Sequence, residues 1–258
     1  MKKVLVLLAV AVLLTVGCNG QVVDQEKGLV KELLTNDQII VGISPDYPPF
    51  ESIDNNGEIE GFDVDLMNAL LEYINKDNGL TLAVTWKSMD FSTIVGALQA
   101  QQIDIGVSGF TYDPDRDVYF STPYIVSQQV VVVSNDSGIT SLDGLAGKKI
   151  GVQTGTTGEG AAQEISGATL VSLTDAMQLF AQLTTQAIDA VVIDKAVADG
   201  FVKNNNCVVL DTPLIDENMS IIIAKANVNL QQAIDAAIGE FVKTDQYQAL
   251  LKKWEIEQ

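Results

Sequence analysis

Apolar and polar positions follow one pattern twice along this chain. Residues 90–104 and 175–189 match at an offset of 85 positions, and each copy holds an apolar-faced helix, a polar turn and an Ile-Asp step into an apolar run. That run reaches Gly109 in the first copy and Asp194 in the second, which are 85 positions apart. Self-similarity at this spacing predicts two α/β lobes of like construction.

The other apolar runs predict the elements that complete the two lobes. Strands are expected at 39–43, 80–86 and 208–210, and helices at 62–73, 158–165, 230–241 and 247–254. Two β-branched runs, 127–133 and 220–224, are suited to carry the chain out of the first lobe and back. Lobe 1 is therefore expected to comprise residues 38–127 and 221–258, and lobe 2 residues 128–220, with a two-stranded hinge between them.

The expected position of Gly109 and Asp194 indicates a ligand site. Ligands of α/β proteins usually bind at the carboxyl ends of the strands, and both residues are predicted to lie at such ends, one in each lobe. The pattern therefore favours a protein that closes on something small.

The N-terminus has the features of an export signal. Lys2 and Lys3 precede an apolar run over residues 4–16, which is too short to span a membrane comfortably. Gly17-Cys18 then resembles a lipobox, although Thr15 departs from the usual leucine. We expect a signal peptide at 1–17, lipidation of Cys18 and a tether at 18–37, with ordinary signal cleavage as the alternative. The protein is then exported, periplasmic or at the cell surface, and held on the membrane only by its lipid.

Composition excludes several kinds of function. The formal charge is −19, which disfavours nucleic acid and anionic membrane surfaces as partners. The chain has no histidine, so Ser-His-Asp and Cys-His catalysis and histidine-ligated zinc are excluded. With Cys18 lipidated, Cys207 has no cysteine to pair with, and its setting favours a small hydrophobe at the start of a strand. No metal and no cofactor is predicted.

Three turns carry side chains that suit ligand binding, and each also has a purely structural interpretation. Thr156 and Glu159 have capping-box spacing, so their helix start either binds a carboxylate or is simply well capped. Asp113-Pro-Asp-Arg116 predicts another helix start, in which Arg116 either clamps a carboxylate or is a surface charge. Asp194 either meets a cation in a cleft or caps the helix expected at 195–199.

Eight motifs together resemble the extracellular solute-binding proteins of polar amino-acid ABC transporters (family 3), over residues 38 to 256. They occur in the order Val41-Gly-Ile-Ser-Pro-Asp-Tyr-Pro-Pro-Phe50, Gly61-Phe-Asp-Val-Asp-Leu66, Ile103-Asp-Ile-Gly-Val-Ser-Gly-Phe-Thr111, Asp113-Pro-Asp-Arg116, Phe120-Ser-Thr-Pro-Tyr124, Leu142-Asp-Gly-Leu-Ala-Gly-Lys148, Gly151-Val-Gln-Thr-Gly-Thr-Thr157 and Ile188-Asp-Ala-Val-Val-Ile-Asp194. The resemblance implies an α/β fold of the periplasmic binding protein-like, type II class: two similar lobes joined by a two-stranded hinge. It also implies a free amino acid as ligand, an ABC permease as partner, a monomer and no enzymatic activity.

The resemblance implies a role for each site residue. The ligand carboxylate is assigned to Arg116, the amide of Thr157 and the hydroxyl of Thr111, and the ligand ammonium to Asp194 and the carbonyl of Gly109. Contacts to the ligand side chain are assigned to Ser44, Asp46, Tyr47, Phe62 and Gln153. The segment between Arg116 and Phe120 is about two residues shorter than is usual in the family, which implies a shifted base for Arg116.

Two other functions and the ligand's side chain stay open. A periplasmic dehydratase similar to cyclohexadienyl dehydratases would use Asp46 as general acid, and a ligand sensor would signal to a partner receptor. Ser44 stands where binders of cationic amino acids often carry an acid, which favours a neutral polar ligand such as glutamine. If Asp46 turns inward, arginine or lysine is favoured instead.

Overall fold

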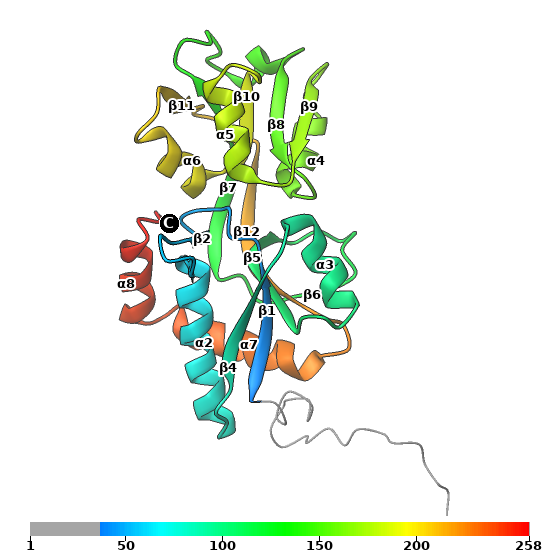
Figure 1. Cartoon of the computed structure of the whole chain (residues 1–258), viewed down its shortest axis with the longest axis vertical. Helices are drawn as coiled ribbons and strands as arrows, with labels where there is room; N and C mark the ends of the chain where they lie inside the picture. Colours follow the sequence, from blue (N-terminus) through cyan, green and yellow to red (C-terminus); the bar gives the residue numbers. More distant parts are fainter. Residues whose placement is uncertain (1–36, 258) are drawn as a thin grey trace, which may run out of the picture.

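The computed structural model describes residues 37–257, which form two lobes joined by a pair of long strands (Figure 1). The expected signal peptide, Cys18 and all of the expected tether before residue 37 lie outside the described residues. Within the described part, no helix is long and apolar enough to cross a membrane.

The first lobe is built on the sheet order β4-β1-β5-β12. Strand β1 (Gln38–Ile43) pairs in parallel with both β4 (Ala83–Ser88) and β5 (Ile105–Thr111), and β12 (Ile215–Ile223) runs antiparallel to β5. Helices α2 (Phe62–Asn78), α3 (Phe91–Gln99), α7 (Val228–Phe241) and α8 (Asp245–Lys253) surround this sheet (Figure 1). The short β2 (Ser52–Ile53) and β3 (Ile59–Glu60) form a hairpin, and β6 (Tyr119–Phe120) pairs with β12.

The second lobe repeats this arrangement with the order β9-β8-β10-β7. Strand β8 (Lys149–Gln153) pairs in parallel with β9 (Thr169–Leu173) and β10 (Ala190–Asp194), and β7 (Ile125–Ser134) is antiparallel to β10. Helices α4 (Thr157–Gln163), α5 (Ala176–Thr184) and α6 (Lys195–Val202) cover it, with the 3-10 turn η1 (Leu142–Leu145). Strand β11 (Cys207–Val209) adds to β7, so Cys207 begins a strand as predicted, with its side chain half-buried.

The sequence repeat is a structural repeat. Helix α3 begins at Phe91 and α5 at Ala176, and β5 begins at Ile105 and β10 at Ala190, so both pairs are 85 positions apart. Strand β9 was not predicted, yet it lies one offset after β4, where the repeat would have placed it. Each lobe therefore presents the end of one central strand to the space between the lobes.

The two predicted crossings are the hinge. Residues 125–129 of β7 pair antiparallel with residues 215–219 of β12, before each strand continues into the sheet of one lobe. Strand β12 begins five residues earlier than predicted, because its polar first half still pairs across the hinge. Within residues 37–257, only these two strands connect the lobes along the chain, which lets one lobe rotate against the other.

Candidate functional site

Asp194 is the last residue of β10 and is almost fully buried between the lobes. It occupies the N-cap position of α6, but its side chain makes no capping hydrogen bond there. The carboxylate instead accepts hydrogen bonds from three side chains: Tyr47 Oη at 2.8 Å, Ser127 Oγ at 2.6 Å and Gln129 Nε2 at 2.9 Å. The structure therefore rejects the helix-cap interpretation and places Asp194 as an acid in the cleft.

No cation accompanies this buried acid. Among residues 37–257, no lysine or arginine nitrogen forms an ion pair with Asp194. Burial, and after it the charge of nearby Glu217, raises the pKa of Asp194 to about 7, against the three hydrogen bonds that lower it. An ionised carboxylate held in this way is suited to a ligand cation, because such a cation would offset its desolvation.

Arg116 faces the same space from the first lobe. It is the only arginine in the chain, and its side chain is only 10% exposed. The guanidinium lies over the rings of Phe91 (5.6 Å) and Phe110 (5.2 Å) and donates from Nη2 to the carbonyl of Gly155 in the second lobe at 2.9 Å. A guanidinium that is flanked by two rings and bonded across the cleft is not an ordinary surface charge.

The helix start predicted at Asp113 is wrong. Residues 112–118 form a turn, in which the Arg116 amide bonds the carbonyl of Asp113 and the Asp115 amide bonds the Asp113 carboxylate. Only these seven residues separate β5 from β6, which leaves too little chain for a helix. The shortened segment that the sequence shows therefore brings Arg116 to the cleft from a turn, where Asp113 Oδ2 is 3.4 Å from its Nε.

Three threonines lie around Arg116. Thr111, Thr156 and Thr157 line the same small cavity as Arg116, Gly109 and Asp194. Thr156 caps α4 as predicted, because its Oγ1 accepts the amide of Glu159 at 3.1 Å, and Glu159 in turn accepts the amide of Gly155. Positive and negative groups thus meet from opposite lobes.

The cavity between these groups has a volume of about 20 Å³, which is close to the space of one water molecule. A molecule as large as an amino acid therefore enters only when the lobes separate. Direct contacts hold them together here: Tyr47 to Asp194, Arg116 to Gly155, and Gln153 Nε2 to Asp46 Oδ2 at 2.9 Å.

Asp46 turns into the cleft. It accepts the hydroxyl of Ser44 at 2.6 Å and, across the cleft, the amide of Ala176 at 2.7 Å, in addition to Gln153. Burial, partly offset by the Ser44 hydrogen bond, raises its pKa. The structure thus gathers Ser44, Asp46 and Gln153 into one polar group beside the clamp, the cavity-lining set of Gly109, Thr111, Arg116, Thr157 and Asp194.

Gly109 is positioned by a buried pair of acids. It has φ +57°, which favours glycine, and its amide donates to Asp63 Oδ2 at 3.1 Å. The hydroxyl of Ser108 donates to Glu51 Oε1 at 2.6 Å. Burial and the charge of Asp63 raise the pKa of Glu51 well above its usual value, and burial raises the pKa of Asp63 to about 6.

Phe62 does not reach the clamp, which corrects the expectation for this residue. It is fully buried in the first lobe, packed against Phe50, Tyr124 and Tyr247. The cavity is lined instead by Tyr47, as expected, and by Phe91, which the sequence analysis missed. The sequence repeat could have indicated this position. Phe91 is the first residue of α3, and its counterpart, the first residue of α5, is Ala176, whose amide binds Asp46.

Glu217 was also missed. It lies on the hinge strand β12, is 3% exposed, and accepts hydrogen bonds at Oε2 from Thr111 Oγ1 (3.1 Å) and Gln129 Nε2 (3.0 Å). Its other oxygen, Oε1, has no hydrogen-bond partner among the described residues. Strand periodicity points its side chain inward, but an acid in this half-exposed run shows no other signal in the sequence.

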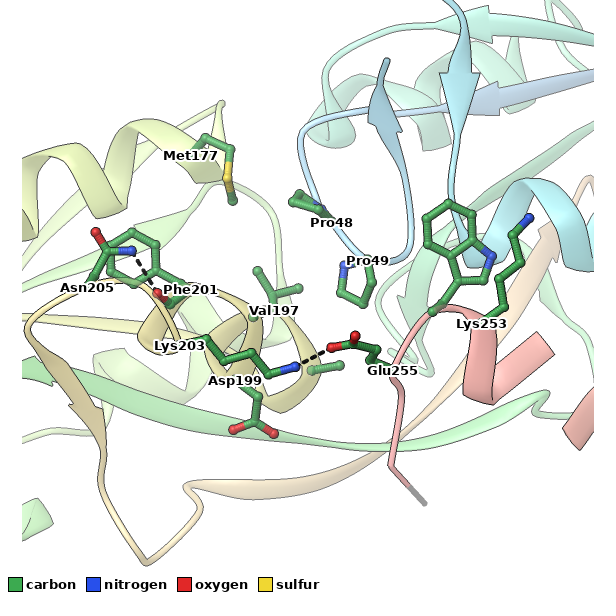
Figure 2. A pocket seen from close by; sticks show the side chains of 13 residues that line it. Pro48, Pro49, Met177, Val197, Asp199, Phe201, Lys203, Asn205, Lys253 and Glu255 are labelled. Carbon is green, nitrogen blue, oxygen red and sulfur yellow. Dashed lines mark hydrogen bonds and ion pairs between the residues drawn. The ribbon is translucent and has the colours of Figure 1, made fainter. Parts of the chain in front are cut away.

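A larger groove separates the lobes near the C-terminal helix (Figure 2). It has a volume of about 430 Å³ and is lined by Pro48, Pro49 and Trp254 on one side and by Val197 and Phe201 on the other. An ion pair between Lys203 and Glu255 joins its two walls. None of the clamp residues lines this groove, and its acids and bases do not converge on one point, so the clamp is the better candidate. No group of metal-binding side chains exists in the part of the chain described.

Comparison with known proteins agrees with this architecture. A sequence model of the family described as "Bacterial extracellular solute-binding proteins, family 3" matches residues 39–257. The chain is 32% identical over 264 residues to the "Arginine-binding extracellular protein ArtP" of Bacillus subtilis (strain 168), with 98% of each covered.

Two solved structures of "an ancestral arginine-binding protein" are similar as well. The form bound to arginine has a TM-score of 0.78 and 34% identity, covering 85% of this chain and 98% of that one. The form bound to glutamine has a TM-score of 0.76 and 34% identity, covering 86% and 99%.

Proposed function

Because this chain belongs to the bacterial extracellular solute-binding proteins of family 3, we propose that it binds a free α-amino acid between its lobes and delivers it to an ABC importer. One observation carries the proposal. Arg116 from the first lobe and Asp194 from the second face one cavity with opposite charges. A free amino acid carries the complementary pair, a carboxylate and an ammonium, on neighbouring atoms.

Each end of such a ligand finds donors or acceptors in the clamp. Arg116, the amide of Thr157 and the hydroxyl of Thr111, once its proton turns from Glu217 to the ligand, receive the carboxylate. Asp194 with the carbonyl of Gly109 receives the ammonium. The ligand then replaces contacts that the lobes make with each other, above all the Tyr47–Asp194 hydrogen bond. Closure is favoured by the ligand because its charged ends are bound from both lobes only in the closed state. This mechanism breaks no covalent bond, and the chain is a solute-binding protein rather than an enzyme.

We assign the ligand to the cationic amino acids, with arginine preferred. In the sequence, Ser44 in place of an acid favoured a neutral polar ligand. In the structure, Asp46, two residues later, turns inward and supplies an acid there. Asp46, Asp194 and Glu217 give the site three acids against the single Arg116, so a ligand with one extra positive charge compensates more of the site's charge. The arginine-binding relatives support this assignment, and the glutamine-bound ancestral structure makes glutamine the second candidate.

The remaining parts of the proposal concern the whole molecule. The hinge lies where β7 and β12 pair, so the lobes are assigned to residues 38–127 with 221–258 and to residues 128–220. The protein acts outside the cytoplasmic membrane, anchored through lipidated Cys18, as a monomer that docks on a permease. Mass spectrometry of the membrane-extracted protein tests the lipid on Cys18. A Cys18→Ser variant provides a second test, because it should leave the membrane fraction.

A thermal-shift screen of the twenty amino acids on residues 19–258 tests the function. We expect the largest upward shift from arginine and a smaller one from lysine or glutamine. Agmatine, which lacks the carboxylate, and 5-guanidinopentanoate, which lacks the ammonium, serve as matched controls and should give little shift. No shift with any amino acid at millimolar concentration would refute amino-acid binding, and a larger shift from glutamine would refute only the preference for arginine.

A further inference from the structure

Glu217 occupies a place in the hinge from which it contacts both halves of the clamp. It lies opposite Ser127 in the β7–β12 ladder, and Ser127 donates to Asp194. A single oxygen, Oε2, accepts from Thr111 on the carboxylate side and from Gln129 on the ammonium side. We infer that Glu217 is a positioning residue that joins the two halves of the clamp through Thr111 and Gln129 and places a second negative charge behind the ammonium subsite. This inference rests on the proposed function.

Gln129 is the element through which Glu217 reaches Asp194. Its Nε2 donates to both acids, at 2.9 Å to Asp194 Oδ2 and 3.0 Å to Glu217 Oε2. Its Oε1 is packed against Gly158 of α4, where an added Cβ would come within 2.5 Å. The amide group is therefore held in place, and its two protons are directed at the two acids.

The arrangement leaves negative charge in excess. Around Asp194 lie the phenol of Tyr47, the polar groups of Ser127 and Gln129 on β7, and Glu217 on β12. Lys195, on α6, is paired with Asp199. The guanidinium of Arg116, in the first lobe, is bonded to Gly155 across the cleft. Glu217 Oε1, buried and without a partner in residues 37–257, is thus a source of repulsion for ionised Asp194 that a bound ammonium relieves.

Proton competition follows from this repulsion. Asp194 must be ionised to hold an ammonium, and its pKa is raised to about 7 by burial and then by Glu217. Affinity for an amino acid is therefore expected to fall as the pH is lowered through this region. Replacing Glu217 with the isosteric, neutral glutamine should move the fall to lower pH, by about half a pH unit or more.

Two variants should move the titration of Asp194 in opposite directions, which distinguishes a specific effect of each side chain on Asp194 from a general loss of packing. Glu217→Gln removes the charge, so Asp194 should titrate at lower pH. Gln129→Met removes a hydrogen bond that stabilises ionised Asp194, so Asp194 should titrate at higher pH. Asp216→Asn is the matched control, because Asp216 is the neighbouring acid on β12, is exposed and bonds only Gln128 outside the clamp.

The experiment has two readouts. Calorimetry with arginine between pH 5 and 9 gives the pH profile of affinity, and ¹³C NMR titration of the Asp194 carboxyl in ligand-free protein measures the same coupling without ligand. We expect the Glu217→Gln midpoint to lie below that of the wild type and of Asp216→Asn, and the Gln129→Met midpoint above it. A coincident Asp194 titration in wild type and Glu217→Gln would overturn the inference. Absence of amino-acid binding in the wild type would instead overturn the proposed function, while the NMR titration still decides the role of Glu217.

Discussion

The hydroxyl of Tyr47 in the first lobe donates to the carboxylate of Asp194 in the second, over 2.8 Å and out of contact with solvent. The same hydroxyl accepts the backbone amide of Asp194 at 3.2 Å. The acid assigned to the ligand's ammonium is thus already engaged across the closed cleft. In the proposed function, ligand binding exchanges this contact for a charged one, so the strength of binding is expected to be a difference between two states of the same carboxylate.

Asp194→Asn should abolish tight binding while leaving the fold intact. The amide keeps the shape but only one acceptor oxygen, whereas Ser127 and Tyr47 donate to different oxygens of Asp194, and it cannot offset the charge of a buried ammonium. The expected loss is about 2–5 kcal/mol of binding free energy. Calorimetric titration with arginine measures it. Asp199→Asn is the control, because Asp199 pairs with Lys195 on the same helix and outside the clamp. An affinity within twofold of wild type would contradict the assignment of Asp194.

Arg116→Lys should weaken binding although it keeps the positive charge. The guanidinium lies over Phe91 and Phe110 and donates to the carbonyls of Gly155 and Thr111, and an ammonium group cannot reproduce this planar set of donors. Loss of one charge-assisted hydrogen bond costs about 1.5–3 kcal/mol, or roughly a 10- to 150-fold weaker dissociation constant. Fluorescence titration measures the change. Lys148→Arg, an exchange of the same kind outside the clamp, should leave the constant unchanged.

Asp46→Asn tests the preference for a cationic side chain. Asp46 accepts hydrogen bonds from Ser44, Gln153 and the amide of Ala176, so the asparagine variant keeps a polar group there without its charge. We expect arginine affinity to fall and glutamine affinity to hold or rise, so that the ratio of the two constants shrinks. The exposed Asp77→Asn carries the same change in net charge and should leave the ratio as it is. An unchanged ratio in Asp46→Asn would remove Asp46 from the specificity site.

Sequence reasoning reached the fold because the repeat and the motifs constrain it strongly. The offset of 85 aligns α3 with α5 and β5 with β10, and it predicts which strand ends face each other. It failed where the outcome depends on packing between distant segments. Phe62 and Phe91 both flank strand ends in the sequence. Phe62 is buried because it packs against Phe50 and Tyr124, whereas Phe91 lines the cavity, and this difference is decided only by three-dimensional packing.

The acids behind the clamp show the same limit. Glu217 lies 154 positions after Asp63, which itself lies 12 positions after Glu51, and nothing local distinguishes the three from exposed carboxylates. Their burial follows from how the first lobe and the hinge pack, which three-dimensional contacts decide. The resemblance assigned residues to contacts with a ligand, and it contained no information on the residues that hold those in place.

Glu51→Gln should change how stability depends on pH. We expect Glu51 to be the protonated partner of the Glu51–Asp63 pair, because burial and Asp63 raise its pKa well above the usual value. A carboxyl with a raised folded-state pKa contributes stability that is fully present below its unfolded pKa, about 4.3, and is lost as the pH rises through the folded value. Asp63, whose pKa is raised to about 6, acts in the same direction between about 4 and 6. The wild type is therefore expected to lose stability as the pH rises from 5 to 8.

In Glu51→Gln the amide donates permanently to Asp63 and still accepts from Ser108, so the loss between pH 5 and 8 should be smaller than in the wild type. Thermal unfolding of both proteins at pH 5 and pH 8 gives the change in melting temperature for each. Subtracting one change from the other removes the contribution of the other buried acids, which is common to both proteins. Glu58→Gln, in the exposed hairpin, is the control and should follow the wild type. If Glu51→Gln lowers the melting temperature by the same amount at pH 5 and pH 8, Glu51 is not the protonated partner of the pair.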